Sequence, residues 1–239
     1  MTTLSIRDNS VLATLFDAGA SGSAVTPLQH FTESPPGLQE DDFIRCSRHE
    51  LSALLPLDQP NPSSQALTDS IAALSNIIQE QPRYASAYVN RAQARRLLMA
   101  YDKLFSSQEA KCTNQVLSDL NLAVELASPP SPRSPVTPHQ STLLAAAHTH
   151  RGLLLLRAAD LIRRGSEVYG LPDHLLKLGS DALEEAASRD FEAGGRYGDK
   201  MAKDMAVRTN PYAKMCGSIV QEAQRRELEA YHGWSGVQS

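Results

Sequence analysis

The sequence is poor in aromatic residues and has no long apolar run. Aromatic residues make up 5% of the 239 residues, whereas apolar residues make up 41%, so alanine and leucine supply most of the apolar surface. This composition disfavours a sheet, which is enriched in β-branched and aromatic residues, and favours helices packed through small side chains. We therefore predict an all-α fold, with a core sufficient for one sizeable domain or two small ones.

Cysteine pairs, membrane-spanning runs and an excess of positive charge are also missing. The three cysteines lie far apart without a CxxC pair, which predicts reduced thiols and neither a disulfide framework nor a zinc site: Cys46, Cys112 and Cys216. No apolar run approaches the length of about 18 residues that spans a bilayer, and the N-terminus lacks a signal pattern. A formal charge of −4 gives no general attraction to nucleic acid. We expect a cytoplasmic protein, with the nucleus as a second compartment, and no nucleic-acid or membrane partner.

Among the residues that are present, the clearest helix is predicted over 85–99, ASAYVNRAQARRLLM. One face carries small residues and one aromatic residue, which predicts close helix packing; these are Ala87, Tyr88, Ala92, Arg95 and Met99. The other face repeats a polar residue at every third position, with Asn90, Gln93 and Arg96. Amide and guanidinium groups suit the recognition of a peptide better than a core.

This helix belongs to a unit that recurs along the chain as helix, loop, helix and proline. A short amphipathic helix is predicted over 5–17, ahead of a tether rich in Gly, Ser and Pro. The predicted organisation is an N-terminal helix plus tether over 1–40, three repeats over 41–208 at about 41–82, 84–128 and 141–199, a Ser/Pro linker at 128–140, and a C-terminal capping helix within 209–239.

The pattern of the unit resembles the tetratricopeptide repeat, a helix pair of about 34 residues with an aromatic residue, a small residue, a later Ala-x3-Phe and a closing proline. Tyr88 with Ala92 matches the first half, as does His148 with Gly152, while 187–191 matches the second half. The resemblance predicts a right-handed α-solenoid of three degenerate tetratricopeptide helix pairs with extended inter-helix insertions.

The insertions follow from the spacing of the matched positions. Ala92 and Val116 are separated by 116 − 92 = 24 residues, and Gly152 and Ala187 by 187 − 152 = 35, where the plain repeat leaves roughly a dozen. Apolar residues continue both first helices into these insertions, so we predict longer helices that project from the solenoid. The continuing residues are Tyr101, Leu104 and Phe105 in the second copy, and Leu161, Ile162 and Val168 in the third.

A narrower resemblance covers nearly the whole chain. The stretches NSVLATLF, RYASAYVNRAQARRL, DLNLAVELA, THRGLLLL, SRDFEAG and NPYAKMC occur in this order and are similar to those of the tetratricopeptide repeat protein 36 family. The resemblance implies a non-enzymatic adaptor or co-chaperone-like scaffold linked to Hsp70-type chaperones and to tyrosine breakdown. It implies a protein or peptide partner, an Hsp70-type chaperone among the candidates, and we expect a monomer.

The predicted partner-binding groove takes residues from the first helices of the second and third repeats. They are Ser86, Val89, Asn90, Gln93 and Arg96, with Ala146, Thr149, His150, Leu153 and Arg157. Asn90 matches the central asparagine of the clamp by which some tetratricopeptide proteins hold the acidic C-terminus of a chaperone, but Ala146 and His150 replace the expected lysine and arginine. We therefore expect a chaperone to bind another face. A second possibility is that the N-terminal helix occupies the groove.

Catalytic motifs are absent from the sequence. No Gly-rich phosphate loop, HExxH, GxSxG or paired metal-binding cluster occurs, so we predict no catalytic residue, no metal site and no cofactor. Residues two apart on a helix point about 200° apart, which prevents His148 and His150 from binding one metal unaided. We expect His148 to pack at the aromatic position and His150 to face the concave side. The alternative is a small helical enzyme or ligand-binding protein that uses both.

The linker SPPSPRSPVTP, residues 128–138, places a serine or threonine directly before each of four prolines. Proline excludes the segment from a helix interior and favours extended structure. Three interpretations follow from this pattern: phosphorylation by a proline-directed kinase, docking of an SH3-like module, or an exposed spacer.

Overall fold

The computed structural model describes residues 37–131, 134–210 and 219–227. Every regular element within these ranges is a helix, which confirms the all-α prediction for the described part of the chain. The helix predicted over 5–17 and the segment 211–216 of NPYAKMC lie outside the described residues.

The order of the elements follows the predicted alternation of helices and loops. They are α2 (Glu40–Leu54), η2 (Leu55–Leu57), α3 (Ser64–Glu80), α4 (Ala85–Leu98), η3 (Tyr101–Lys103), α5 (Ala110–Ala127), α6 (Pro138–Arg163), α7 (Asp173–Leu176), α8 (Ser180–Arg196) and α9 (Lys200–Thr209), with a further helix over 219–227.

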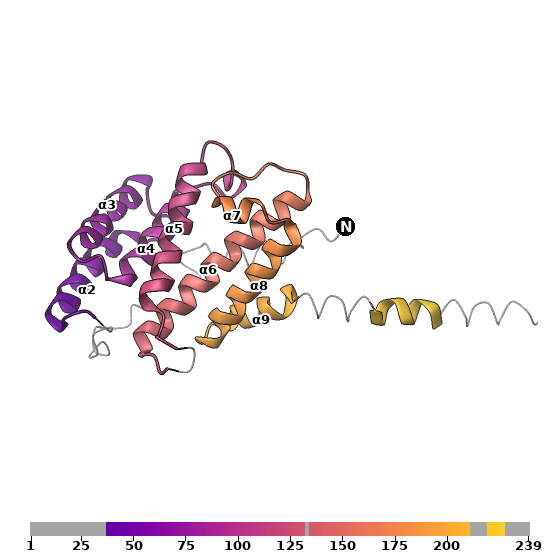
Figure 1. Ribbon diagram of the computed structural model, residues 1–239. Coiled ribbons are helices and arrows are strands. Elements are labelled where there is room, and N and C mark those ends of the chain that lie inside the picture. The colour runs from indigo at the N-terminus through magenta and orange to yellow at the C-terminus, as the bar shows by residue number, and fades with distance from the viewer. Residues whose placement is uncertain (1–36, 132–133, 211–218, 228–239) are drawn as a thin grey trace, which may run out of the picture.

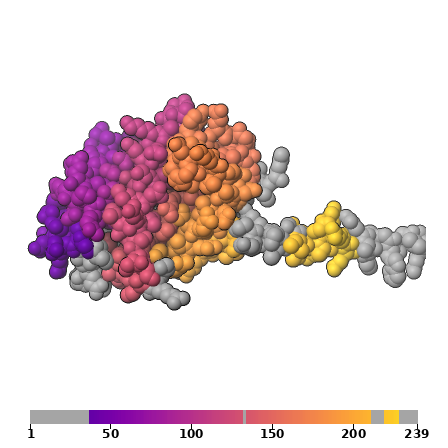
Figure 2. Space-filling view, viewed as in Figure 1, coloured from indigo at the N-terminus to yellow at the C-terminus, as the bar shows by residue number. Residues whose placement is uncertain are grey.

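Helices that are consecutive in the chain pack against one another (Figure 1). Helix α3 packs against α2 and α4, α5 packs against α4 and α6, and α8 packs against α6 and α9. The α6–α8 interface is the most extensive of these, and α4 also contacts α6 directly. Figure 2 shows the helices from α2 to α9 as one continuous body. None of the helices in the described part of the chain has the length and apolar content needed to cross a membrane.

Side-chain caps fix where several helices begin. The Ser63 hydroxyl accepts a hydrogen bond from Ala66 N (3.1 Å) at the start of α3. At the start of α6, Thr137 Oγ1 accepts from Gln140 N (3.2 Å) while Thr137 N donates to Gln140 Oε1 (3.0 Å). These two bonds form a capping box, which satisfies amide groups that have no partner within the helix. Asp199 Oδ1 similarly accepts from Ala202 N (2.8 Å) at α9.

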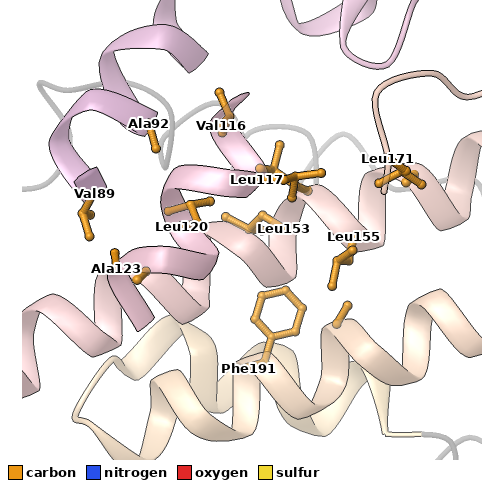
Figure 3. Packing of buried hydrophobic residues seen from close by; sticks show 14 of the residues in the cluster. Val89, Ala92, Val116, Leu117, Leu120, Ala123, Leu153, Leu155, Leu171 and Phe191 are labelled. Carbon is orange, nitrogen blue, oxygen red and sulfur yellow. The ribbon is translucent and has the colours of Figure 1, made fainter. Parts of the chain in front are cut away.

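The core divides into a large and a small cluster of buried side chains. The large cluster joins α4, α5, α6 and α8 (Figure 3) and includes Val89, Leu117, Leu120, Leu153 and Phe191. The small cluster joins α2, α3 and the start of α4 and consists of Phe43, Cys46, Ala53, Leu74, Ile77, Tyr84 and Ala87. The packing face predicted for 85–99 is confirmed, since Ala87 and Ala92 have no exposed surface and Tyr88 and Met99 keep at most 5%.

Gly152 explains how α6 and α8 approach so closely. A Cβ atom at this position would lie 2.9 Å from Phe191 Cε1, closer than packed carbon atoms tolerate. The ring of Phe191 is fully buried and fills the space above the glycine. In the third predicted repeat, the small residue Gly152 therefore contacts Phe191 of the later Ala-x3-Phe sequence directly.

The prediction of a lengthened first helix is wrong for the second copy. Helix α4 ends at Leu98, because Met99 has an extended backbone with φ −91° and ψ 131°. The guanidinium of Arg96 then donates to the Met99 carbonyl oxygen (3.0 Å) and covers the end of the helix. Leu104 and Phe105 are buried, but they pack from the loop between η3 and α5.

The third copy follows the prediction only in part. Helix α6 extends to Arg163 and so includes Leu161 and Ile162, whereas Val168 lies in the loop that follows. Gly165, with φ +77°, takes a left-handed conformation that favours glycine. Tyr169 N donates to Phe105 O (2.9 Å), so the loop after α6 contacts the loop between η3 and α5.

The predicted burial of residue 219 is also corrected. Ile219 is 60% exposed and Val220 54% exposed, and helix 219–227 stands away from the body in Figure 1. Helix α9 packs against α8 instead, because Ala202 is fully buried and Met201 and Met205 are half-buried on the large cluster. The helix predicted for DKMAKDMAVRT is thus confirmed as the element that follows α8.

Candidate functional site

An apolar groove of about 270 Å³ lies between α2 and α4 and is also lined by residues of η2. Leucine side chains from α2 and η2 form one wall, and α4 forms the other. The lining residues are Leu51, Leu54, Leu55, Leu57, Asp58, Asn90, Gln93, Ala94 and Leu97. Leu55 is 57% exposed, so an apolar side chain remains open to solvent at the rim. Apolar grooves with a few polar groups are typical binding sites.

A buried carboxyl group beside the groove ties α2 to α4. Glu50 Oε1 accepts a hydrogen bond from Asn90 Nδ2 (2.8 Å), and Glu50 Oε2 accepts from the Tyr84 hydroxyl (2.6 Å) and the Ser86 hydroxyl (3.0 Å). Burial raises the pKa of Glu50, and the three hydrogen bonds oppose this rise. The same burial, together with the Glu50 charge, raises the pKa of Tyr84. Tyr84 therefore stays a hydrogen-bond donor across the physiological pH range.

The ten residues predicted to line a groove fall into different environments. Asn90 and the exposed Gln93 line the α2–α4 groove, and Ser86 bonds to Glu50 beside it. Ala146 is exposed. Val89 and Leu153 keep 7% and 4% of their surface and belong to the large cluster. Their part in binding a partner stays a prediction.

The remaining polar residues of the predicted set are engaged within the protein. The Thr149 hydroxyl donates to Asp199 Oδ2 (3.2 Å) between α6 and the start of α9. Arg96 is only 4% exposed, which differs from the open polar face expected for 85–99. The physical reason is that its guanidinium closes the end of α4 at Met99.

Arg96 takes part in a basic cluster between α4, η3 and α6. Its guanidinium carbon lies 5.7 Å from the centre of the Tyr101 ring, and that of Arg157 lies 4.8 Å from the same ring. Both distances are within the range of a cation–π contact. Arg157 also donates to Asp160 Oδ2 (3.1 Å). Burial lowers the pKa of His150 to about 3, and the Arg96 charge adds to this effect, so the imidazole is neutral at physiological pH.

His148 points to a different cluster. Its Nδ1 lies 2.8 Å from Asp190 Oδ1 of α8, and its ring stacks on Tyr197 with centroids 6.1 Å apart. The predicted packing of His148 agrees with these contacts, whereas the position of His150 on the concave side stays a prediction. Within the described ranges, no group of three histidine, cysteine or acidic residues is arranged to hold a metal ion.

Sequence reasoning missed Glu50 and the contact of Tyr101 with both arginines. Glu50 lies 34 residues from Tyr84 and 40 from Asn90, and its neighbours Arg48 and His49 are exposed. The available signal for its burial was its spacing from Cys46, which is buried. Glu50 follows Cys46 by four residues, and residues four apart share a helix face.

Comparison with known proteins places the chain among named relatives. It is 42% identical over 240 residues to the L-tyrosine degradation gene cluster protein hmgX of Aspergillus fumigatus, covering 95% of this chain and 94% of that protein. It is 29% identical over 223 residues to the tetratricopeptide repeat protein 36 homologues of Drosophila pseudoobscura pseudoobscura and Drosophila melanogaster, covering 92% of this chain and 94% of each. No family model and no solved structure matches. The chain belongs to the tetratricopeptide repeat protein 36 family.

Proposed function

We propose that this protein is a non-catalytic adaptor or co-chaperone-like scaffold that binds a protein partner in L-tyrosine degradation through the α2–α4 groove. The observation that carries the proposal is the groove itself, in which an exposed leucine rim adjoins the amides of Asn90 and Gln93. Apolar contacts would supply affinity and the amides would fix the orientation of a bound segment. The relative named for a tyrosine degradation gene cluster supports the choice of pathway.

We further propose the three-pair arrangement, with α2/α3, α4/α5 and α6/α8 as tetratricopeptide pairs of a right-handed solenoid. A repeated arginine bridge supports it. Arg91 of α4 donates to Asp119 of α5 (3.0 and 2.7 Å) and to Ser75 of α3 (3.1 Å). In the next pair, an arginine of α6 makes the corresponding contacts: Arg151 donates to Asp190 of α8 (2.8 and 2.6 Å) and to Asn121 of α5 (2.8 Å).

The two bridges occupy matching positions. Each aspartate lies one residue before a buried apolar residue of the second helix, at Leu120 and Phe191. The contact to the preceding pair lies one residue after that apolar position, at Ser75 after Leu74 and at Asn121 after Leu120. Such a match favours equivalent roles for α3, α5 and α8. In this proposal residues 1–40 and 209–239 flank the solenoid, and the protein is a monomer of the cytoplasm and nucleus.

The contact between Asn90 and Glu50 argues against binding of a chaperone's acidic C-terminus by a carboxylate clamp. The Asn90 amide already donates to the Glu50 carboxylate, which takes the place that a ligand carboxylate would need. A ligand carboxylate there would have to displace Glu50 from the Asn90 amide. We therefore propose that an Hsp70-type chaperone contacts a different face, and we expect a peptide with its acidic C-terminus to show no tight binding in isothermal titration.

A capture experiment tests the groove. The tagged wild-type chain is compared with Leu55→Glu, which places a charge on the groove rim, and with Leu176→Glu on α7. Leu55 and Leu176 are 57% and 43% exposed, so both changes carry a small folding cost. Lysate from cells that use L-tyrosine as carbon source supplies the partners, which are identified by mass spectrometry.

We expect an enzyme of L-tyrosine degradation to be captured by the wild type and by Leu176→Glu, and to be lost with Leu55→Glu. Gln93→Arg is expected to weaken capture in the same way. Equal capture of that enzyme by all variants would remove the groove from the proposal. Loss with Leu176→Glu alone would move the site to α7.

A further inference from the structure

A second groove, of about 420 Å³, lies between α2 and α3 at one end of the body (Figure 1). Its floor is buried, since Ala53, Ser70 and Ile77 keep at most 7% of their surface. The Ser70 hydroxyl donates to Ala53 O (2.5 Å), so the polar group of the floor is already satisfied. Because two of the three floor side chains are short, another element can approach these helices closely.

The α3 wall of this groove carries two carboxylates. Asp69 and Glu80 are exposed lining residues and lie 80 − 69 = 11 residues apart. Eleven residues make about three helical turns, so both side chains lie on one face of α3, about 16 Å apart along its axis. The exposed amide of Asn76 lies between them on the same face.

Positive charge from the groove itself does not neutralise these carboxylates. Among the described residues that line it, none is a lysine or an arginine, and His49 is the basic one. Asp69 Oδ1 accepts a hydrogen bond from the neutral amide of Gln65 (2.9 Å). Arg45, one turn before His49 on α2, forms an ion pair with Asp42 (2.7 Å). The groove is therefore complementary to a ligand that brings two positive charges about 16 Å apart.

The later helix pairs of the proposed arrangement join to the helix before them at the corresponding place. Arg91 of α4 donates to Ser75 of α3 (3.1 Å), and Arg151 of α6 donates to Asn121 of α5 (2.8 Å). Each arginine lies one residue before a buried small residue of its own helix. A long basic side chain therefore bridges each of these pairs to a preceding helix.

Short side chains take these positions in α2 and α3. Ser52 stands where the arginine would be, one residue before the buried Ala53, and Ala73 stands where the aspartate would be, one residue before the buried Leu74. Ser52 and Ala73 both line the groove. The groove thus opens on the side from which a preceding helix packs in the later pairs, and the basic side chain of such a bridge is missing from α2.

A helix suits this groove better than an extended segment does. An extended segment needs main-chain hydrogen-bond partners, whereas the backbone groups of α2 and α3 are bonded within their own helices. A helix satisfies its own backbone and presents one face with side chains at positions i, i+4, i+7 and i+11. The same spacing separates the lining residues of α3, which are Asp69, Ala73, Asn76 and Glu80.

We propose that the α2–α3 groove binds an amphipathic helix of a partner protein that carries two arginines or lysines eleven residues apart, with small side chains between them. The two cations pair with Asp69 and Glu80, and the small side chains pack on Ala53 and Ala73. Residues 5–17 of this chain fit the groove less well, because they contain one arginine and two aspartates. The site shares no lining residue with the α2–α4 groove, so it does not depend on the partner proposed for that groove.

The test measures binding of a synthetic helix to the full chain. The probe is a fluorescein-labelled, alanine-based peptide of about 18 residues with two arginines eleven residues apart, and its fluorescence anisotropy is followed as the chain is added. In the control peptide the second arginine is moved by two residues, which turns it about 200° around the helix. We expect the control to bind at least about tenfold more weakly than the probe. The affinity of the probe should also fall as NaCl is raised from about 0.05 to 0.5 M.

Variants of the chain assign this binding to the groove. Asp69→Lys with Glu80→Lys should weaken binding of the probe at least about tenfold, and a peptide with glutamates in place of the arginines should bind this variant better than it binds the wild type. Ala73→Arg fills the groove while both carboxylates remain, and should also weaken binding. Glu125→Lys, at an exposed position of α5, is the matched control and should bind the probe as the wild type does. Circular dichroism confirms that each variant keeps its helix content.

Several results would overturn the proposal. These are no binding of the probe, equal binding of the probe and the control peptide, and equal binding by the wild type and the Asp69→Lys, Glu80→Lys variant. Loss of binding with Leu55→Glu would place the helix in the α2–α4 groove. Displacement of the probe by a peptide of residues 5–17 would make that segment the occupant. Dimers of the chain alone that the charge reversal abolishes would make the occupant a second copy.

Discussion

Replacing Glu50 tests the link between α2 and α4 beside the candidate groove. Glu50→Ala removes the acceptor of three hydrogen bonds and leaves the Tyr84 hydroxyl and the Asn90 amide in a site where Glu50 itself was only 8% exposed. A buried donor without its acceptor costs about 1–3 kcal/mol. We expect the free energy of unfolding to fall by about 2 kcal/mol, because two such donors are affected while Ser47 Oγ, 3.3 Å from the Tyr84 hydroxyl, and Ser86 Oγ, 3.4 Å from Asn90 Nδ2, stay within reach.

Glu50→Gln is the matched control. Its amide keeps the size of the side chain, its oxygen can still accept from Asn90, and its nitrogen can donate to the hydroxyl groups of Tyr84 and Ser86. At pH 5 we expect the free energy of unfolding to stay within about 1 kcal/mol of the wild type.

The free energy of unfolding should depend on pH differently in the wild type and in Glu50→Gln. Burial raises the pKa of Glu50 in the folded state, so the unfolded chain releases its proton first as the pH rises. The contribution of Glu50 is therefore complete below the ordinary glutamate pKa of about 4 and is lost as the pH rises through the folded-state pKa. Glu50→Gln should thus gain stability relative to the wild type as the pH rises from about 4 through the folded-state pKa of Glu50.

Urea unfolding followed by circular dichroism at several pH values measures both effects. Parallel pH profiles for the wild type and Glu50→Gln would refute the assigned burial of the carboxyl group. An unchanged midpoint for Glu50→Ala would show that the three hydrogen bonds do not hold α2 to α4.

Three other substitutions test separate parts of the fold. Gly152→Ala should lower the free energy of unfolding by about 1–2 kcal/mol, because the new Cβ meets the Phe191 ring; Gly179→Ala, with nothing within 4 Å, is the control, and equal stability of the two would contradict the contact. Asp190→Asn should lower the free energy of unfolding by about 3 kcal/mol at neutral pH. Hydrogen bonds and charge from Arg151 and His148 lower the pKa of Asp190 despite burial, so the wild-type advantage is present above the ordinary aspartate pKa and shrinks as the pH falls through the folded-state pKa. Acid unfolding of the two proteins measures this difference. Thr137→Val should cost about 1 kcal/mol by loss of the α6 cap, seen as a lower melting temperature, and an unchanged temperature would argue against the cap.

The helices were predictable from the sequence because their signals are local. The small residues of 85–99 recur at helical spacing, and the structure buries that face in α4. Gly152 and Phe191 were also matched correctly, since their positions in a repeat pattern define which side chains meet. Helix ends that depend on side-chain contacts were not predictable. Arg96 closes the end of α4 by donating to the Met99 carbonyl oxygen. In the sequence, an arginine in this role cannot be distinguished from one on a solvent-exposed helix face.

The candidate site was predictable only in part. Asn90 and Gln93 were expected on a binding face and do line the α2–α4 groove. The other wall comes from α2 and η2, whose leucines carry no polar stripe to mark a recognition surface. Glu50 follows the exposed residues Arg48 and His49 and precedes Leu51. It becomes a buried acceptor only because α4 brings Asn90 beside it. Contacts between separate helices of this kind have no fixed spacing, so periodicity does not reveal them.

In the proposed three-pair arrangement, the arginine bridges show how the same helix contacts can form at different sequence separations. Arg91 and Asp119 are 28 residues apart, whereas Arg151 and Asp190 are 39 apart, yet both arginines make the same paired contacts to their aspartates. The difference, 39 − 28 = 11 residues, lies in the connections and in the longer α6. Lengthening a loop adds little to its closure entropy, whereas a displaced arginine would remove two hydrogen bonds and a paired charge from a buried carboxylate. In the proposed arrangement the helix contacts are therefore fixed, and the connections are free to vary in length.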